Sequence, residues 1–366
     1  MKQKIFAFIK NEMVLFVAAA FAAASMCIVP PTGSYLDYFD FSVLALLFCL
    51  MAVVNGLQDK GVLFQFAYAL LSRIDNLRRL SEVLVFLCFF SSMFVTNDVA
   101  LLTFVPFSAL ILTYTKQEKY LIYVLVLQTI AANLGSMLTP MGNPQNLYLY
   151  QHFQLKAFDF VAITFPITAF SSFLLLLACQ FVKKEKVQVT FSEKVVLKKP
   201  KIVAGYAVLF FLCLLAVVHL LHYVIVLAVV CIFIYFLDKK NFQSVDYSLL
   251  LTFICFFIFV GNLGKMDSFC SIMSRFLVGR EKEAAVLLSQ LISNVPAAVL
   301  LSGFTYDARA LVVGTNIGGL GTLVASLASL ISFKLYTKIE NANPLRYIVT
   351  FTGVNAFFLI ILMTVF

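Results

Sequence analysis

The chain has 366 residues, of which 62% are hydrophobic and 12% are charged, and its mean hydropathy is +0.98. Soluble domains are roughly 45–50% apolar and ~25% charged, so this composition excludes an ordinary soluble protein and indicates an integral membrane protein. The net charge of +9 does not indicate nucleic-acid binding, because the basic residues lie in short loops between apolar runs, as positive-inside topology produces.

Long uncharged runs predict helices that cross the lipid bilayer, which takes about 20 apolar residues. Two further apolar stretches, 82–113 and 284–305, carry polar residues at their middles. We expect these to be re-entrant hairpins, because non-helical backbone at membrane depth survives only where it is buried or faces a wet cavity. The full spans are expected, in chain order, over residues 11–29, 40–57, 119–139, 158–181, 202–218, 222–237, 246–263, 309–333 and 345–366.

The basic residues predict the orientation of the chain in the cytoplasmic (inner) membrane. If the N-terminus is cytoplasmic and 82–113 is a hairpin, nearly every basic loop falls on the cytoplasmic side, including the seven lysines of segment 183–201. If 82–113 were a full span, the later basic loops would lie outside. The exceptions on the outer side, where we expect an interfacial helix, are Lys265, Arg275, Arg280 and Lys282.

An internal repeat is the most informative pattern in the sequence. Residues 40–61 parallel residues 246–267, each beginning with an aspartate before a long apolar run. The segments "SMFVTND" (92–98) and "SQLISNV" (289–295) both place a serine five residues before an asparagine that follows a hydroxyl residue. Later in each half, "NLGSMLT" (133–139) and "NIGGLGT" (316–322) share the pattern N-x-G-x-x-x-T. The three matches occur in the same order in both halves.

Under the expected topology, span 40–57 runs inward and span 246–263 runs outward, so the repeats are inverted, as in many secondary transporters. We therefore predict an all-α polytopic membrane protein with two inverted repeats, two re-entrant helical hairpins and broken transmembrane helices. The expected domains are residues 1–182 (the first span and the first repeat), a basic cytoplasmic linker over 183–201, and the second repeat over 202–366.

Polar residues at the hairpin tips and in the broken helices are the candidates for binding. Helix ends inside a membrane direct N–H dipoles toward anions and free carbonyls toward cations. The first hairpin is predicted to turn at Thr96-Asn97-Asp98 and the second at Ser293-Asn294-Val295-Pro296. The alternative, that such residues only hold helices together, explains one tip but not two tips in matching repeats. The segment "NLGSMLTPMGNPQN" (133–146) is expected to unwind, and "GTNIGGLGT" (314–322), which has no proline, is expected to break more mildly.

These motifs resemble the ion-transporter superfamily, which includes divalent-anion:sodium symporters, citrate transporters and arsenite permeases. The resemblance covers residues 40 to 366 and rests on the hydroxyl-Asn tips, N-[LI]-G-x-x-x-T and the tail "GNPQN". It implies that the tips bind a carboxylate, and that sodium lies between each tip and the broken helix beside it. The substrate-binding candidates are then Thr96, Asn97, Asp98, Thr139, Asn143, Ser293, Asn294 and Thr322. The cation-binding candidates are Ser92, Asn97, Asn133 and Gly135 in one half, and Ser289, Asn294, Asn316 and Gly318 in the other.

Asp98 departs from the family pattern, because the dicarboxylate members have threonine at that tip position and the second tip here has Val295. Its carboxylate would repel an anion unless it is protonated or paired with a cation. We consider three roles for Asp98: a carrier of the coupling proton or cation, a cap for the second helix of the hairpin, or a hydrated group in the cytoplasmic vestibule.

The sequence thus predicts a secondary active transporter that moves a small anion, a carboxylate or oxyanion, by alternating access with Na+ or H+ as the coupling ion. The alternative on the same scaffold is Na+/H+ exchange or arsenite-type efflux. A membrane-embedded enzyme is disfavoured, because no Ser/His, paired-Asp or HExxH constellation is visible. No further cofactor is expected. The expected partners are the anion and the lipid bilayer, without nucleic acid, and we consider a homodimer as one assembly.

Overall fold

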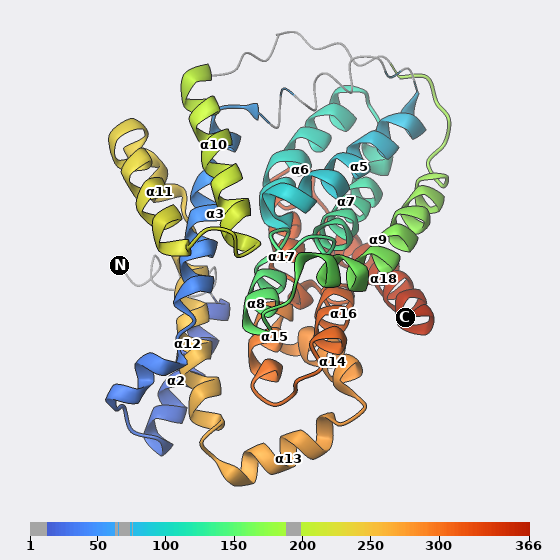
Figure 1. The fold of residues 1–366 in the computed structure, drawn as a ribbon. Coiled ribbons are helices and arrows are strands. Elements are labelled where there is room, and N and C mark those ends of the chain that lie inside the picture. The colour runs from blue at the N-terminus through green and yellow to red at the C-terminus, as the bar shows by residue number, and fades with distance from the viewer. Residues whose placement is uncertain (1–12, 63–64, 66–73, 75, 188–198) are drawn as a thin grey trace, which may run out of the picture.

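In the computed structural model the chain is helical, and no β-strand occurs in the part described, which comprises residues 13–62, 65, 74, 76–187 and 199–366 (Figure 1). The α-helices of this part are α2 (Met13–Ile28), α3 (Phe41–Asp59), α5 (Leu77–Val95), α6 (Asn97–Tyr114), α7 (Leu121–Ser136), α8 (Pro144–His152), α9 (Ala157–Cys179), α10 (Pro200–Val217), α11 (Tyr223–Leu237), α12 (Tyr247–Leu263), α13 (Asp267–Leu277), α14 (Glu281–Ile292), α15 (Asn294–Ser302), α16 (Ala308–Gly318), α17 (Leu327–Tyr336) and α18 (Pro344–Val365). Short 3-10 helices are η1 (Gly33–Tyr38), η2 (Glu118–Tyr120), η3 (Lys239–Ser244) and η4 (Leu323–Ala325).

These helices confirm the predicted all-α membrane protein. Five of them, α3, α6, α9, α10 and α18, are long and apolar enough to cross a membrane. Helices α2, α11, α12 and α17 are apolar but shorter. The segment 265–282, for which an interfacial helix is predicted, contains the separate helix α13. The N-terminal lysines that were expected to orient the chain, and most of the basic linker 183–201, lie outside the described residues.

Helices α3 and α12, which the sequence pairs as repeats, begin in the same way and run in opposite directions. Asp40 caps α3 by accepting from the N–H of Val43, and Asp246 caps α12 by accepting from the N–H of Leu249. The end of α3 lies beside the start of α12, where Asn55 Nδ2 donates to the carbonyl of Ser244 at 2.6 Å. The antiparallel arrangement is the one that inverted repeats require.

Each predicted hairpin is a pair of helices that meet at a single non-helical residue. Helices α5 and α6 turn at Thr96, and α14 and α15 turn at Ser293. The two hairpins extend into the molecule from opposite ends, with α5 and α6 above and α14 and α15 below (Figure 1). Glu185, in the linker, holds the base of the first hairpin. Its carbonyl accepts from the N–H of Leu77, and its carboxylate accepts from Gln117 Nε2.

Two helices are interrupted beside the hairpins. The first break separates α7, which ends at Ser136, from α8, which begins at Pro144; the second separates α16, which ends at Gly318, from α17, which begins at Leu327. The expectation of a milder second break is therefore wrong. Glycine-rich backbone between 318 and 327 leaves the α-helix as fully as the two prolines of the first break do, and recovers only the 3-10 turn η4.

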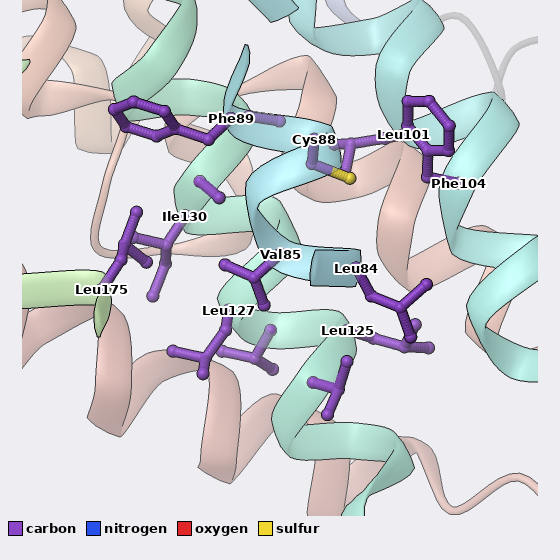
Figure 2. Packing of buried hydrophobic residues seen from close by; sticks show 14 of the residues in the cluster. Leu84, Val85, Cys88, Phe89, Leu101, Phe104, Leu125, Leu127, Ile130 and Leu175 are labelled. Carbon is purple, nitrogen blue, oxygen red and sulfur yellow. The ribbon is translucent and has the colours of Figure 1, made fainter. Parts of the chain in front are cut away.

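The helices form two groups that interleave the halves of the sequence. Helices α2, α3, α10, α11 and α12 pack with one another on one side, and the hairpins, the broken helices, α9 and α18 form the other group (Figure 1). The second group is built around apolar contacts among α5, α6, α7 and α9, including Phe89, Phe104 and Ile130 (Figure 2). The groups meet where α3 contacts α6 and α8 and where α12 contacts α15.

Candidate functional site

The two hairpin tips have the same backbone conformation. Thr96 has φ 71° and ψ 149°, and Ser293 has φ 75° and ψ 154°. Positive φ is unfavourable for residues other than glycine, and for a β-branched residue such as threonine it is a marked outlier. In each case the strained residue is followed at once by a buried asparagine, Asn97 or Asn294, that starts the second helix of the hairpin.

The first tip is bonded directly to the first helix break. The backbone N–H of Asn97 donates to the carbonyl of Gly142 at 3.0 Å, and its side-chain Nδ2 donates to Asn133 Oδ1 at 3.1 Å. At the second tip, a Cβ on Gly319 would lie 2.8 Å from Asn294 Nδ2, so that amide lies directly against the second break. Each asparagine thus lies between a hairpin and an unwound segment, and Asn97 is hydrogen-bonded to it.

The contacts between each hairpin and its broken helix are repeated in the two halves. Gly135 lies against Ser92, and Gly318 lies against Ser289, so closely that a Cβ on either glycine would lie within 3 Å of the serine Oγ. A second matched contact comes from the threonines of N-x-G-x-x-x-T. Thr139 Oγ1 donates to the carbonyl of Met93 at 2.5 Å, and Thr322 Oγ1 donates to the carbonyl of Gln290 at 3.4 Å.

Buried amides join the two halves at the centre of the molecule. Asn143 Nδ2 donates to Asn316 Oδ1 at 3.1 Å, and Asn316 Nδ2 donates to Asn146 Oδ1 at 2.6 Å. Asn133 Oδ1 accepts from Ser326 Oγ at 3.1 Å. All of these side chains are buried. Since a buried amide must keep its hydrogen bonds, the network fixes the relative position of the two breaks.

A cavity of about 150 Å³ lies beside the first tip, between the two groups of helices. Asp98 and Asp246 both line it, and Asp246 is the charged group that acts on Asp98 through space. Among the described residues, no lysine or arginine lines the cavity, and none forms a hydrogen bond or ion pair with the carboxylate of Asp98. The polar lining comprises Asn55, Thr96, Asp98, Asn143, Ser244 and Asp246.

The structure brings most of the predicted site residues together at the tips and the breaks. Thr139 and Thr322, predicted to bind substrate, donate hydrogen bonds to hairpin backbone, and neither lines the cavity beside Asp98. The carboxylate of Asp98 accepts no hydrogen bond from the described first turn of α6; the N–H of Asp98 itself is capped by Asn97 Oδ1 at 3.0 Å. The geometry therefore favours the coupling and vestibule roles of Asp98 over the capping role.

Several polar residues of this region were not predicted from the sequence. Asn146 and Ser326 join the amide network, and Asp246 lines the cavity. Gln290 binds the second break, donating from Nε2 to the carbonyls of Gly318 at 2.8 Å and Leu320 at 2.9 Å. Asn146 belongs to the "GNPQN" tail and could have been singled out, whereas Gln290 aligns with Met93 in the first half and gives no signal.

The described residues at the tips and the breaks supply groups that suit the binding of ions. Neutral amides, hydroxyls and exposed backbone groups at helix ends are the groups with which membrane transporters hold anions and small cations. Helices α6 and α15 both begin at the tips, and the dipole at the N-terminus of a helix favours negative charge there. Serine and asparagine oxygens together with free carbonyls suit Na+.

The close packing of Gly135 leads to a prediction that can be tested by stability. A Cβ at this position would collide with the backbone carbonyl of Phe89, which cannot move without displacing α5. We expect Gly135→Ala to destabilise the protein by about 1–3 kcal/mol, the usual effect of overpacking, and to lower its Tm in detergent. Gly353→Ala in α18 is the matched control, because nothing lies within 4 Å of its added Cβ. Equal Tm values for the two variants would contradict the tight hairpin–helix contact.

Several known proteins have sequences related to this chain. The family model of the citrate transporters matches residues 5–310. An uncharacterized transporter of Methanocaldococcus jannaschii is 34% identical over 294 residues, which cover 79% of each chain. The inner membrane protein YbiR of Escherichia coli is 31% identical over 306 residues, or 81% of this chain and 80% of its own. The chain is a multi-pass membrane transport protein that belongs to the citrate transporter family.

Proposed function

We propose that the protein is a secondary active transporter that moves a small carboxylate or oxyanion across the cytoplasmic membrane, coupled to Na+ or H+. Membership of the citrate transporter family supports the anion, and the inner-membrane relative supports the location. The single observation that carries the proposal is the pair of matching tips. Two strained hydroxyl residues, Thr96 and Ser293, each present a buried asparagine to an unwound helix.

The division into two groups of helices supports alternating access. One group holds both tips and both breaks, and the other, α2, α3, α10, α11 and α12, holds neither. Movement of the group that holds the tips and breaks against the other group would carry the site from one face of the membrane to the other without breaking the amide network. The orientation with a cytoplasmic N-terminus is the one that the basic loops favour.

Counterflow in proteoliposomes tests this function directly. Purified protein is reconstituted with unlabelled citrate, phosphate, sulfate or arsenite inside, and uptake of the labelled counterpart is followed while Na+ and pH are varied separately. We expect exchange of at least one carboxylate or oxyanion above protein-free vesicles. Exchange of none of the panel, together with Na+-dependent proton movement in the same vesicles, would overturn the anion transporter.

Sodium/proton exchange is the second candidate, and the cavity beside the first tip is the observation that favours it. That cavity contains two carboxylates, Asp98 and Asp246, and no lysine or arginine among its described lining residues. An acidic, partly buried cavity attracts cations and repels anions unless a proton or cation neutralises it. A pH-sensitive dye trapped inside vesicles, with Na+ added outside and no organic anion present, distinguishes this function from anion transport.

A further inference from the structure

A second polar cavity, of about 370 Å³, lies at the end of the molecule where the basic linker joins α10. Its walls come from the last residues of α3, the start of α10 and the segment after α11. None of these residues belongs to the tips or the breaks. The described residues that line it are Asp59, Lys60, Lys199, Lys240, Asp238, Asn241 and Ser244.

Both carboxylates of this cavity form ion pairs with Lys60. Lys60 Nζ lies 2.7 Å from Asp59 Oδ2 and 2.7 Å from Asp238 Oδ2, and its side chain is only 7% exposed. Tyr206 donates a further hydrogen bond to Asp238 Oδ2 at 3.0 Å. Burial acts to lower the pKa of Lys60, but its hydrogen bonds to Asp238 and Asp59 outweigh this effect and raise it, so the ammonium group stays charged.

Two lysines of the cavity remain available to a ligand. Lys199 and Lys240 are exposed, and neither forms an ion pair with a residue in the described part of the chain. Three lysines against two aspartates leave the lining with a net positive charge. Lys199 is also the residue before the first turn of α10, a helix of 18 residues whose N-terminal N–H groups add positive potential.

Exposed apolar surfaces adjoin the same cavity. Helix α11 ends in Tyr235, Phe236 and Leu237, which are 56%, 75% and 54% exposed, and the next residue, Asp238, is a wall of the cavity. Lys239 Nζ lies 5.2 Å from the centre of the Tyr235 ring. Tyrosine and lysine at the end of an apolar helix are typical of the level of the lipid headgroups. On α10, Val208 and Phe211 are exposed as well.

We propose that this cavity binds the phosphate of an anionic phospholipid, with Lys199 and Lys240 contacting the headgroup and the apolar faces of α10 and α11 contacting the acyl chains. A basic pocket between membrane helices is suited to such a headgroup. The site does not depend on which substrate is transported. It adjoins the transport cavity, because Ser244 lines both cavities and its carbonyl accepts from Asn55, another residue of the cavity beside Asp98.

Native mass spectrometry of the full chain in detergent tests the site by titration with phosphatidylglycerol, with phosphatidylcholine and inorganic phosphate as separate arms. We expect phosphatidylglycerol to bind more tightly than phosphatidylcholine. The double variant Lys199→Ala/Lys240→Ala should bind phosphatidylglycerol about thirtyfold more weakly, since each lysine near an anionic lipid surface contributes about 1 kcal/mol. The matched control Lys184→Ala/Lys338→Ala removes two exposed lysines elsewhere and should bind as the unmodified protein does.

Charge reversal, Lys199→Glu/Lys240→Glu, should abolish the preference for phosphatidylglycerol while a Tm close to that of the unmodified protein shows that the variant is folded. Equal affinity of the unmodified protein and the Lys199→Ala/Lys240→Ala variant for phosphatidylglycerol would overturn the site. Saturation by millimolar inorganic phosphate with no preference between the two lipids would overturn the lipid as its ligand and assign the cavity to soluble phosphate.

Discussion

Asn97→Ala and Asn294→Ala are each expected to lower substrate exchange in proteoliposomes by roughly 10- to 100-fold. Asn97 links the first tip to Asn133, and Asn294 lies against the second break at Gly319. Removing the Asn97 amide leaves the buried Asn133 Oδ1 without that hydrogen bond, which costs about 1–3 kcal/mol, and either substitution removes a group proposed to face substrate. If both asparagines bind the same anion, the double variant should show no exchange above protein-free vesicles.

The control for this experiment is Asn355→Ala in α18. Asn355 is also buried, and its Nδ2 donates to the carbonyl of Phe351 within the same helix at 2.9 Å, far in sequence from either tip. Its loss should lower stability but leave exchange within about threefold of the unmodified protein, because its amide bonds within α18 and not to a tip or a break. Full exchange by both tip variants would remove the basis of the proposed site.

The two tips need not contribute equally, and the structure indicates which half is held more firmly. Asn97 makes backbone and side-chain hydrogen bonds to the first break. At the second break the corresponding binding role is taken by Gln290, which donates to two carbonyls and accepts from the N–H of Thr322 at 2.9 Å. Asn294 is therefore less occupied by structural bonds than Asn97, and its loss should affect substrate affinity more than Tm.

Much of the fold could be predicted from the sequence because membrane helices follow from simple patterns. Uncharged runs gave helix positions, and Asp40 and Asp246 before such runs mark the helix starts that the structure shows as caps. The polar interruptions at residues 96 and 293 coincide with the hairpin turns. The extent of the second break was misjudged, because proline was taken as the main cause of unwinding. At the second break Gly321 adopts a positive φ of 105°, which lets the backbone leave the helix without a proline.

The site was predicted only in part, because sequence patterns identify polar residues and not the directions of their side chains. Asn97 meets Asn133 and Asn143 meets Asn316. Thr139 and Thr322 bond to hairpin backbone. The proximity of Asp246 to Asp98 could not be predicted, since the two belong to different halves and different groups of helices. The pairing of α3 and α12 within one group likewise appears only in three dimensions.

The position of Asp98 connects the tip to the movement proposed for transport. Asp98 belongs to the first hairpin, whereas Asp246 starts α12 in the other group of helices. Any movement that narrows the cavity between them brings two carboxylates closer in a region of low dielectric constant, where their repulsion increases. Narrowing would therefore be easier when one carboxylate holds a proton or a cation, and this would couple ion binding to the proposed conformational change.

Asp98→Asn is accordingly expected to abolish stimulation of uptake by an imposed proton gradient while keeping counterflow within about threefold, because the amide preserves the shape and removes the charge. Asp246→Asn should give a weaker effect of the same kind, since asparagine caps a helix as well as aspartate does and α12 keeps its start. The two substitutions should be non-additive, because the residues share one cavity.

Asp307→Asn, at the exposed start of α16, is the control for removal of a capping carboxylate and should leave the coupling intact. If the proton gradient still drives uptake by the Asp98→Asn variant and a lowered Tm is its only change, Asp98 is a structural residue and coupling must rest on other groups.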